Sequence, residues 1–400
     1  MSVERSPLPN MVVSVGMVVA LMMATGILWM PSILGVMKGV FQIDAREVGR
    51  LASAEAGAFL VATIYASGKP LAALKRLALI GCALLMGANI ALVLARDVVP
   101  LMPMRVLAGF GTGVGASLVM KVCAMSATPT RFFGIYSASF SVVMILGFQF
   151  IGHLVSAWAG EASSVDGLIR VATAVWGVHA ALAALASLLL IIGMRGVARE
   201  PSAGAARDSA GQAIGVQAAI GLSAIALFFL ARGNVWPFLQ VMGGSHGFAV
   251  TGVANALSMF AVFGVLGSLA AAAIPPAVAR SYAIGVAVLA LFGGLYALYA
   301  PASLLWYTIG CAIGGFFWNF VFALGLGLLA RIDATGRACV LGMTVSSAGS
   351  AAGPYLAGML IEGSGYQSVA WLAGGLCAAG FIGVALAETR RVPVEAGTAA

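Results

Sequence analysis

The chain has 400 residues, of which 62% are hydrophobic and only 8% are charged, with a formal net charge of +8. Because a soluble domain carries roughly a quarter charged residues, this composition excludes a soluble globular protein and indicates an all-α integral membrane protein. The excess of positive charge fits basic loops beside membrane spans, so we do not expect nucleic-acid binding.

Apolar runs of about 20 residues follow one another along the chain, as expected for membrane-spanning helices. The first run is too long for the core of a signal peptide and is followed by many more, so we expect it to be retained as a helix. Glycine, proline and charge clusters divide the runs into twelve predicted helices. Their predicted ranges are 11–36, 48–66, 77–95, 100–122, 133–157, 168–194, 214–238, 249–272, 282–300, 303–329, 338–361 and 368–387.

One long polar segment, residues 196–213, interrupts these runs and predicts a cytoplasmic linker between two domains, residues 1–195 and 214–400. Each domain contains six predicted helices. The two domains also resemble each other at a nearly constant offset, as Gly26 with Trp29 and Gly233 with Trp236 illustrate. Two pseudo-symmetric six-helix bundles are therefore predicted, with a solute site between them near the middle of the membrane.

An even number of spans places both termini on one side of the membrane. That side then holds most of the lysine and arginine residues of the loops. Cytoplasmic loops carry an excess of these residues, so both termini are predicted to be cytoplasmic and the protein to lie in the cytoplasmic (inner) membrane.

Two stretches resemble the major facilitator superfamily of secondary transporters. Residues 105–115 read RVLAGFGTGVG, an arginine followed by spaced glycines, and the loop GKPLAALKR contains Gly68 and Arg76. The resemblance covers nearly the whole chain and implies two bundles that rock about a central site, with Gly68 and Arg76 at a cytoplasmic gate. Ala72 stands where the family typically has an acidic residue. The fifth helix also lacks the Gly-Pro element of the family's proton-driven drug exporters.

Three ionisable residues interrupt apolar helices: Glu55 in the second, Arg105 in the fourth and Arg232 in the seventh. Charges inside a span are costly and usually mark a transport pathway or a coupling site. Each lies about six residues from the outer end of its helix, so similar depths are expected. We predict proton coupling for Glu55 and Arg105, because the carboxyl would pair with an arginine only when ionised; Arg105 and Arg232 are both possible partners. The alternative is a structural ion pair.

Aromatic residues accompany the third of these charges. Arg232 and Trp236 are four residues apart and share one helix face, and Trp29 holds the related place on the first helix. Trp318 and Asn319 are neighbours in the tenth helix. All five are predicted to bind substrate. The alternative for the tryptophans is anchoring at the membrane interface.

The remaining chemistry-bearing residues carry no pattern. The histidines His153, His179 and His246 are scattered, the five cysteines lack metal-ligand spacing, and no nucleophile lies near a base. We therefore expect no metal, no cofactor and no enzymatic activity. The glycines of residues 105–115 indicate close helix packing and not a phosphate-binding loop.

The leading hypothesis is a secondary active transporter that moves a small organic solute by alternating access coupled to protons. Because two arginines and one glutamate within the spans leave a net positive charge, an organic or aromatic anion is favoured as the solute. One alternative is efflux of hydrophobic compounds by proton antiport, and another is a non-transporting sensor on a transporter fold. The expected partners are the solute, protons and the lipid bilayer, and we expect a monomer.

Overall fold

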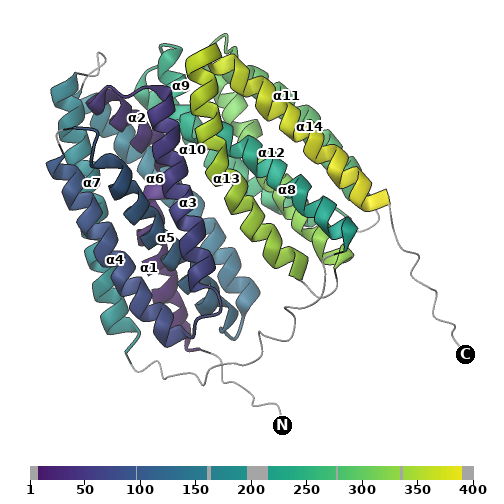
Figure 1. The fold of residues 1–400 in the computed structure, drawn as a ribbon, viewed down its shortest axis with the longest axis horizontal. Coiled ribbons are helices and arrows are strands. Elements are labelled where there is room, and N and C mark those ends of the chain that lie inside the picture. The colour runs from purple at the N-terminus through teal and green to yellow at the C-terminus, as the bar shows by residue number, and fades with distance from the viewer. Residues whose placement is uncertain are drawn as a thin grey trace, which may run out of the picture.

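The computed structural model describes residues 8–95, 97–159, 164–195, 215–275, 278–333 and 337–389, and helices make up nearly all of this part of the chain (Figure 1). The first half contains α1 (Asn10–Leu28), α2 (Met30–Phe41), α3 (Ala45–Ala66), α4 (Leu71–Leu94), α5 (Leu101–Ala124), α6 (Pro129–Trp158) and α7 (Val165–Gly193). The second half contains α8 (Val216–Val235), the 3-10 turn η2 (Trp236–Phe238), α9 (Leu239–Ser245), α10 (Val250–Ala273), α11 (Arg280–Tyr299), α12 (Leu304–Ile332), α13 (Arg337–Ser364) and α14 (Tyr366–Thr389). The prediction of an all-helical protein is confirmed. The predicted linker, residues 196–213, lies outside the described residues.

Two of the predicted helices are interrupted beside a proline. The helix predicted at residues 11–36 divides into α1 and α2 at Trp29, with Pro31 in the first turn of α2. The helix predicted at residues 214–238 ends as α8 and continues through η2, which contains Pro237, into α9. Proline has no N–H to donate to the preceding turn, so a break is expected at both places.

Ten helices within the described residues are long and apolar enough to cross a membrane, and α3 and α13 are not among them. α3 carries several charged residues in its first half, and α13 is rich in glycine, alanine and serine. The two pack against each other: Gly49 lies against the backbone carbonyl of Pro354, and Gly358 against that of Ala45. Helices that face each other inside a membrane protein can contain small and polar residues that lipid-facing helices avoid.

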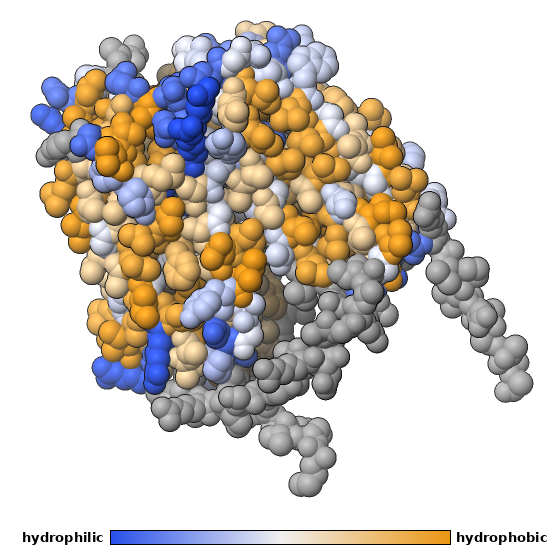
Figure 2. Space-filling model, in the orientation of Figure 1, coloured by the Kyte–Doolittle hydropathy of each residue, from blue (hydrophilic) through white to orange (hydrophobic). Residues whose placement is uncertain are grey.

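The helices of the first half, α1–α7, lie on one side of the molecule, and those of the second half, α8–α14, lie on the other (Figure 1). α3 packs on α5 and α4 on α7 in the first half, while α10 packs on α12 and α8 on α13 in the second. Apolar side chains cover most of the visible flank, and hydrophilic ones gather mainly near its upper and lower ends (Figure 2). This distribution is that of a multi-pass membrane protein.

The two ends of the molecule differ. We call the end where α1 begins and α7 and α14 finish the terminal end, and the opposite end the closed end (Figure 1). At the closed end, Arg46 of α3 pairs with Glu362 of α13 at 2.9 Å. In the same helix pair, the backbone N–H of Tyr355 donates to the Ser53 hydroxyl at 2.8 Å. The two halves are therefore joined here by polar contacts as well as by close backbones.

α6 and α10 form a second contact between the halves towards the closed end. The Gln149 amide donates to Asn255 Oδ1 at 3.0 Å and to Ser258 Oγ at 2.9 Å. Gly152 allows a close approach, because a Cβ at this position would lie 2.7 Å from the Ala254 Cβ. These two helix pairs, together with α2 against η2 and α9, join the halves on the side away from the termini.

Candidate functional site

A cavity of about 740 Å³ lies between the two halves. Its walls come from α1, α2, α3, α5 and α6 on one side and from α8, η2, α10, α12 and α13 on the other. Met120, Phe133, Leu326 and Met343 line it, and all four belong to the parts of their helices nearest the terminal end. The cavity therefore extends towards the terminal end, while the contacts of the closed end shut off the other side.

The cavity wall is mainly apolar and aromatic and carries one charge. Among the described residues that line it, Arg232 is the only charged one, and no acidic residue is present. Its other main polar side chains are one amide and several hydroxyls: Asn319, Tyr136, Ser137, Ser141, Ser268, Ser346, Ser347 and Ser350. The aromatic members include Phe140, Phe229, Trp236, Phe260, Trp318 and Phe322.

Arg232 stands in the last turn of α8, immediately before the chain changes to η2. Its guanidinium carbon lies 5.6 Å from the centre of the Phe229 ring, and its buried Nε has no hydrogen-bond partner within the described residues. The ring face and the negative end of the helix dipole both favour a cation here. The guanidinium remains available for a carboxylate, which it can bind through two parallel hydrogen bonds.

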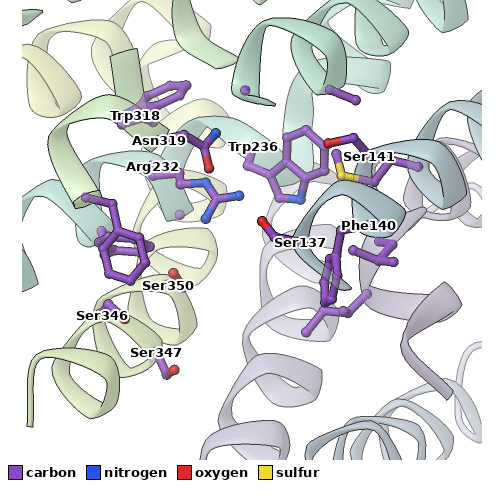
Figure 3. Close-up of a pocket in the computed structure, with 18 of the residues that line it drawn as sticks. Ser137, Phe140, Ser141, Arg232, Trp236, Trp318, Asn319, Ser346, Ser347 and Ser350 are labelled. Atoms are coloured by element: carbon purple, nitrogen blue, oxygen red, sulfur yellow. The ribbon is translucent and has the colours of Figure 1, made fainter. Parts of the chain in front are cut away.

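Asn319 and two tryptophans surround this cation. The Asn319 Nδ2 donates to the Gly315 carbonyl at 2.8 Å, and Figure 3 shows the Asn319 amide and the Arg232 guanidinium pointing towards the same part of the cavity. Trp236 packs on Phe260 with ring centres 4.7 Å apart. Trp318 is 4% exposed, and its Nε1 has no partner in the described part of the chain. Four of the five predicted substrate-binding residues thus line one cavity.

Trp29 is the fifth and is not part of the cavity wall. Its Nε1 donates to the Val143 carbonyl at 2.7 Å, and its indole lies against Gly147 of α6. The edge-to-face contact with His179 of α7 has a centroid distance of 4.9 Å. Trp29 therefore packs α1 against α6 and α7, although the duplication relates it to Trp236, which does face the cavity.

Glu55 and Arg105 form an ion pair inside the first half of the molecule. Their exposed fractions are 0% and 2%, and neither residue lines the cavity, although the adjacent Ala56 does. The second carboxylate oxygen, Oε1, has no hydrogen-bond partner among the described residues. Glu55 thus pairs with Arg105 and not with Arg232, and the three charges expected at one depth do not form one cluster.

The glycines of residues 105–115 explain how this pair forms. A Cβ on Gly109 would lie 2.1 Å from the backbone oxygen of Glu55, and one on Gly113 would lie 2.4 Å from that of Phe59. α5 and α3 therefore cross with their backbones in contact, which brings Arg105 beside Glu55. The interpretation of these glycines as packing residues agrees with this geometry.

The predicted gate residues lie at the terminal end. Gly68 has a φ of 75° in the turn between α3 and α4, a conformation that favours glycine. Arg76 is exposed on α4 and forms no ion pair within the described ranges. Neither residue is among the described residues that line the cavity.

The serines of the cavity are not among the substrate-binding residues predicted from the sequence. Ser346, Ser347 and Ser350 lie on α13, and Ser137 and Ser141 lie on α6. Spacings of three and four residues place such groups on one helix face, and the low hydropathy of α13 is the signal that could have identified them. No group of three or more potential metal ligands occurs in the part of the chain that the structure describes.

No protein-family model matches the chain, and no curated protein matches it in sequence. Solved structures do match. The D-xylose-proton symporter has a TM-score of 0.71 at 14% identity, covering 95% of this chain and 98% of its own. The nucleoside transporter NupG has a TM-score of 0.69 at 14% identity, covering 96% of this chain and 100% of its own. A bacterial homologue of the human lysosomal transporter Spinster, in an inward-facing and occupied conformation, has a TM-score of 0.63 at 14% identity, covering 95% of this chain and 92% of its own.

These structures are transporters of the major facilitator superfamily, so the chain has the fold of that superfamily. The resemblance stated from the sequence is confirmed at this level, and the subfamily stays open. The solved structures named above that share this fold are those of membrane transporters.

Proposed function

We propose that the protein is a secondary active transporter that moves an organic, aromatic anion across the cytoplasmic membrane by alternating access coupled to protons. The observation that carries this proposal is the cavity between the halves, where Arg232, the only charged residue among the described lining residues, stands among aromatic side chains.

The proposed architecture has twelve spans in two pseudo-symmetric bundles, residues 1–195 and 214–400, joined by a cytoplasmic linker at residues 196–213. α1 with α2 forms the first span, and α8 with η2 and α9 forms the seventh. Their proline-associated breaks at related positions support the duplication. The excess of basic residues in the loops of the terminal end supports a cytoplasmic location for both termini. The conformation described here is then open to the cytoplasm.

An anionic solute follows from the electrostatics of the cavity. A guanidinium in a mainly apolar wall has lost part of its hydration, and closing the cavity around it would remove more. A carboxylate on the solute would supply the missing counter-charge through a bidentate ion pair with Arg232. Trp236 and Trp318 offer ring faces to the organic part, Trp236 also offers its indole N–H, and Asn319 offers an amide oxygen.

Glu55 and Arg105 are proposed to couple solute movement to protons. Protonation of Glu55 would remove the negative partner of Arg105 inside the first bundle, where no water can replace it, and would favour a different packing of α3 and α5. Ala56 transmits such a change, because it follows Glu55 directly and lines the cavity. The similar fold of a proton symporter supports coupling to protons.

Binding to the purified protein tests the anion proposal. We expect benzoate and related aromatic monocarboxylates to raise the temperature of unfolding, and their uncharged amides to have no effect. Arg232→Ala should abolish the stabilisation, and Arg232→Lys should restore part of it. Arg170→Ala, at an exposed arginine of α7, is the matched control and should behave as the unchanged protein. Equal stabilisation by the acids and their amides would rule out an anion site.

The mainly apolar wall also supports a second candidate, efflux of hydrophobic compounds by proton antiport. That function predicts binding of neutral aromatic compounds that does not depend on Arg232. A non-transporting sensor is distinguished by its failure to move bound solute into proteoliposomes.

A further inference from the structure

Two groups of polar side chains in the cavity differ in the hydrogen bonds they can offer a solute. One group lies near Arg232, where the guanidinium and the indole of Trp236 can donate hydrogen bonds (Figure 3). Hydroxyl groups lie below them on α13, at Ser346 and Ser347 (Figure 3). The two regions offer different chemistry to a solute.

The two serines of α13 present acceptors. The Ser346 hydroxyl donates to the Met343 carbonyl at 2.8 Å, and the Ser347 hydroxyl donates to the same carbonyl at 3.0 Å. A hydroxyl has one hydrogen to donate and two lone pairs to accept with. Since both hydrogens are used within the helix, the groups available to the solute are oxygen lone pairs.

The spacing of the two regions sets the size of the solute that could reach both. A Cβ on Gly233, the residue after Arg232, would lie 2.9 Å from the backbone oxygen of Ser350. The backbones of Gly233 and Ser350 therefore lie at the same height along their two helices. Ser346 and Ser347 are one helical turn nearer the terminal end, which corresponds to about 5–6 Å along α13. One benzene ring spans a comparable distance.

The charge of the cavity decides which donor would fit. Within the described cavity wall no acidic residue accompanies the serines. An ammonium group would therefore stand near Arg232 without a counter-charge, whereas a neutral hydroxyl would need only the serine lone pairs.

We infer that the solute is a hydroxylated aromatic anion, bound through its negative group by Arg232 and through a neutral hydroxyl by Ser346 and Ser347. This inference rests on the proposed function and names the substrate class of the same cavity.

Calorimetric titration of the purified protein with benzoate, 4-methoxybenzoate and 4-hydroxybenzoate tests it. The methoxy compound keeps the para oxygen but carries a methyl group in place of the hydrogen, so it cannot donate; benzoate, which is smaller than both, controls for the added size. We expect 4-hydroxybenzoate to bind roughly three- to tenfold more tightly than the other two, as one net hydrogen bond implies. In the double variant Ser346→Ala, Ser347→Ala this gain should disappear, while benzoate affinity stays within about twofold.

Two further variants control for the loss of a serine elsewhere and for the loss of the hydroxyl itself. Ser139→Ala removes a serine that makes the same kind of bond to its own helix on α6 but lies outside the cavity wall, and it should keep the gain. Ser347→Thr retains the hydroxyl and should also keep it. If 4-hydroxybenzoate and 4-methoxybenzoate bind equally, or if the gain survives in the double variant, the inference is wrong while Arg232-dependent benzoate binding still supports the anion proposal. If none of the three acids binds in an Arg232-dependent way, both proposals fall.

Discussion

Glu55→Gln is the substitution whose effect on stability follows most directly from the structure. It leaves Arg105 charged, 2% exposed and opposite a neutral amide, with its buried Nε already lacking a hydrogen-bond partner in the described chain. Loss of one partner from a buried ion pair costs about 3–5 kcal/mol. The amide oxygen of glutamine can still accept a hydrogen bond, so we expect a loss near the lower end of this range.

The double variant Glu55→Gln, Arg105→Gln separates the cost of an unpaired charge from that of changed shape. With both charges removed, the free energy of unfolding should recover by about half or more, because no ion is left unpaired. Unfolding in detergent, followed by tryptophan fluorescence against denaturant, measures both variants. If the double variant is no more stable than Glu55→Gln, the ion pair is not what Glu55 contributes.

The same single variant tests the coupling role. In proteoliposomes, Glu55→Gln should abolish accumulation of an aromatic acid driven by a pH gradient and leave counterflow in place. A Glu55→Gln protein that still concentrates solute along a proton gradient would contradict the role assigned to this pair.

Five further substitutions test the packing and the contacts that position the site. Gly109→Ala should destabilise the protein by at least about 1–3 kcal/mol, because its Cβ would overlap a backbone carbonyl of α3, whereas Gly57→Ala, with open space around it, should unfold at the unchanged temperature. Trp29→Phe should lower the unfolding temperature with little effect on solute affinity. Trp236→Phe should weaken solute binding with little effect on the unfolding temperature. Titration of both variants measures the affinity. Glu362→Gln should change the free energy of unfolding by no more than about 1 kcal/mol, because the ion pair it removes is largely exposed.

Hydropathy made the helices predictable. The ranges of apolar residues locate nearly every helix, and Pro237 marks the break after α8. The similar depths of Glu55 and Arg105 in their helices suggested that they could pair, since depth depends on the rise per residue and little on tertiary detail. The glycines after Arg105 indicated the close helix contact that allows it.

The direction in which a side chain faces could not be predicted in the same way. Trp29 and Trp236 hold related places in the two halves, yet one packs inside its bundle and the other lines the cavity. Arg232 belongs to the second half and lines the cavity, and it forms no ion pair with a carboxylate among the described residues. Such differences depend on how each helix is rotated by its neighbours. The serines of α13 could not be singled out from the sequence, because isolated serines are common in membrane spans. The structure shows that they line the same cavity as Arg232.

Uptake of a radiolabelled aromatic monocarboxylate into proteoliposomes tests the central claim most directly. We expect the unchanged protein to accumulate the acid when a pH gradient is imposed, and we expect Arg232→Ala to show no uptake above protein-free vesicles while keeping its folded yield. Uptake that is unaffected by Arg232→Ala, or uptake of the neutral amide at the same rate as the acid, would show that the lone cation of the cavity does not select the transported solute.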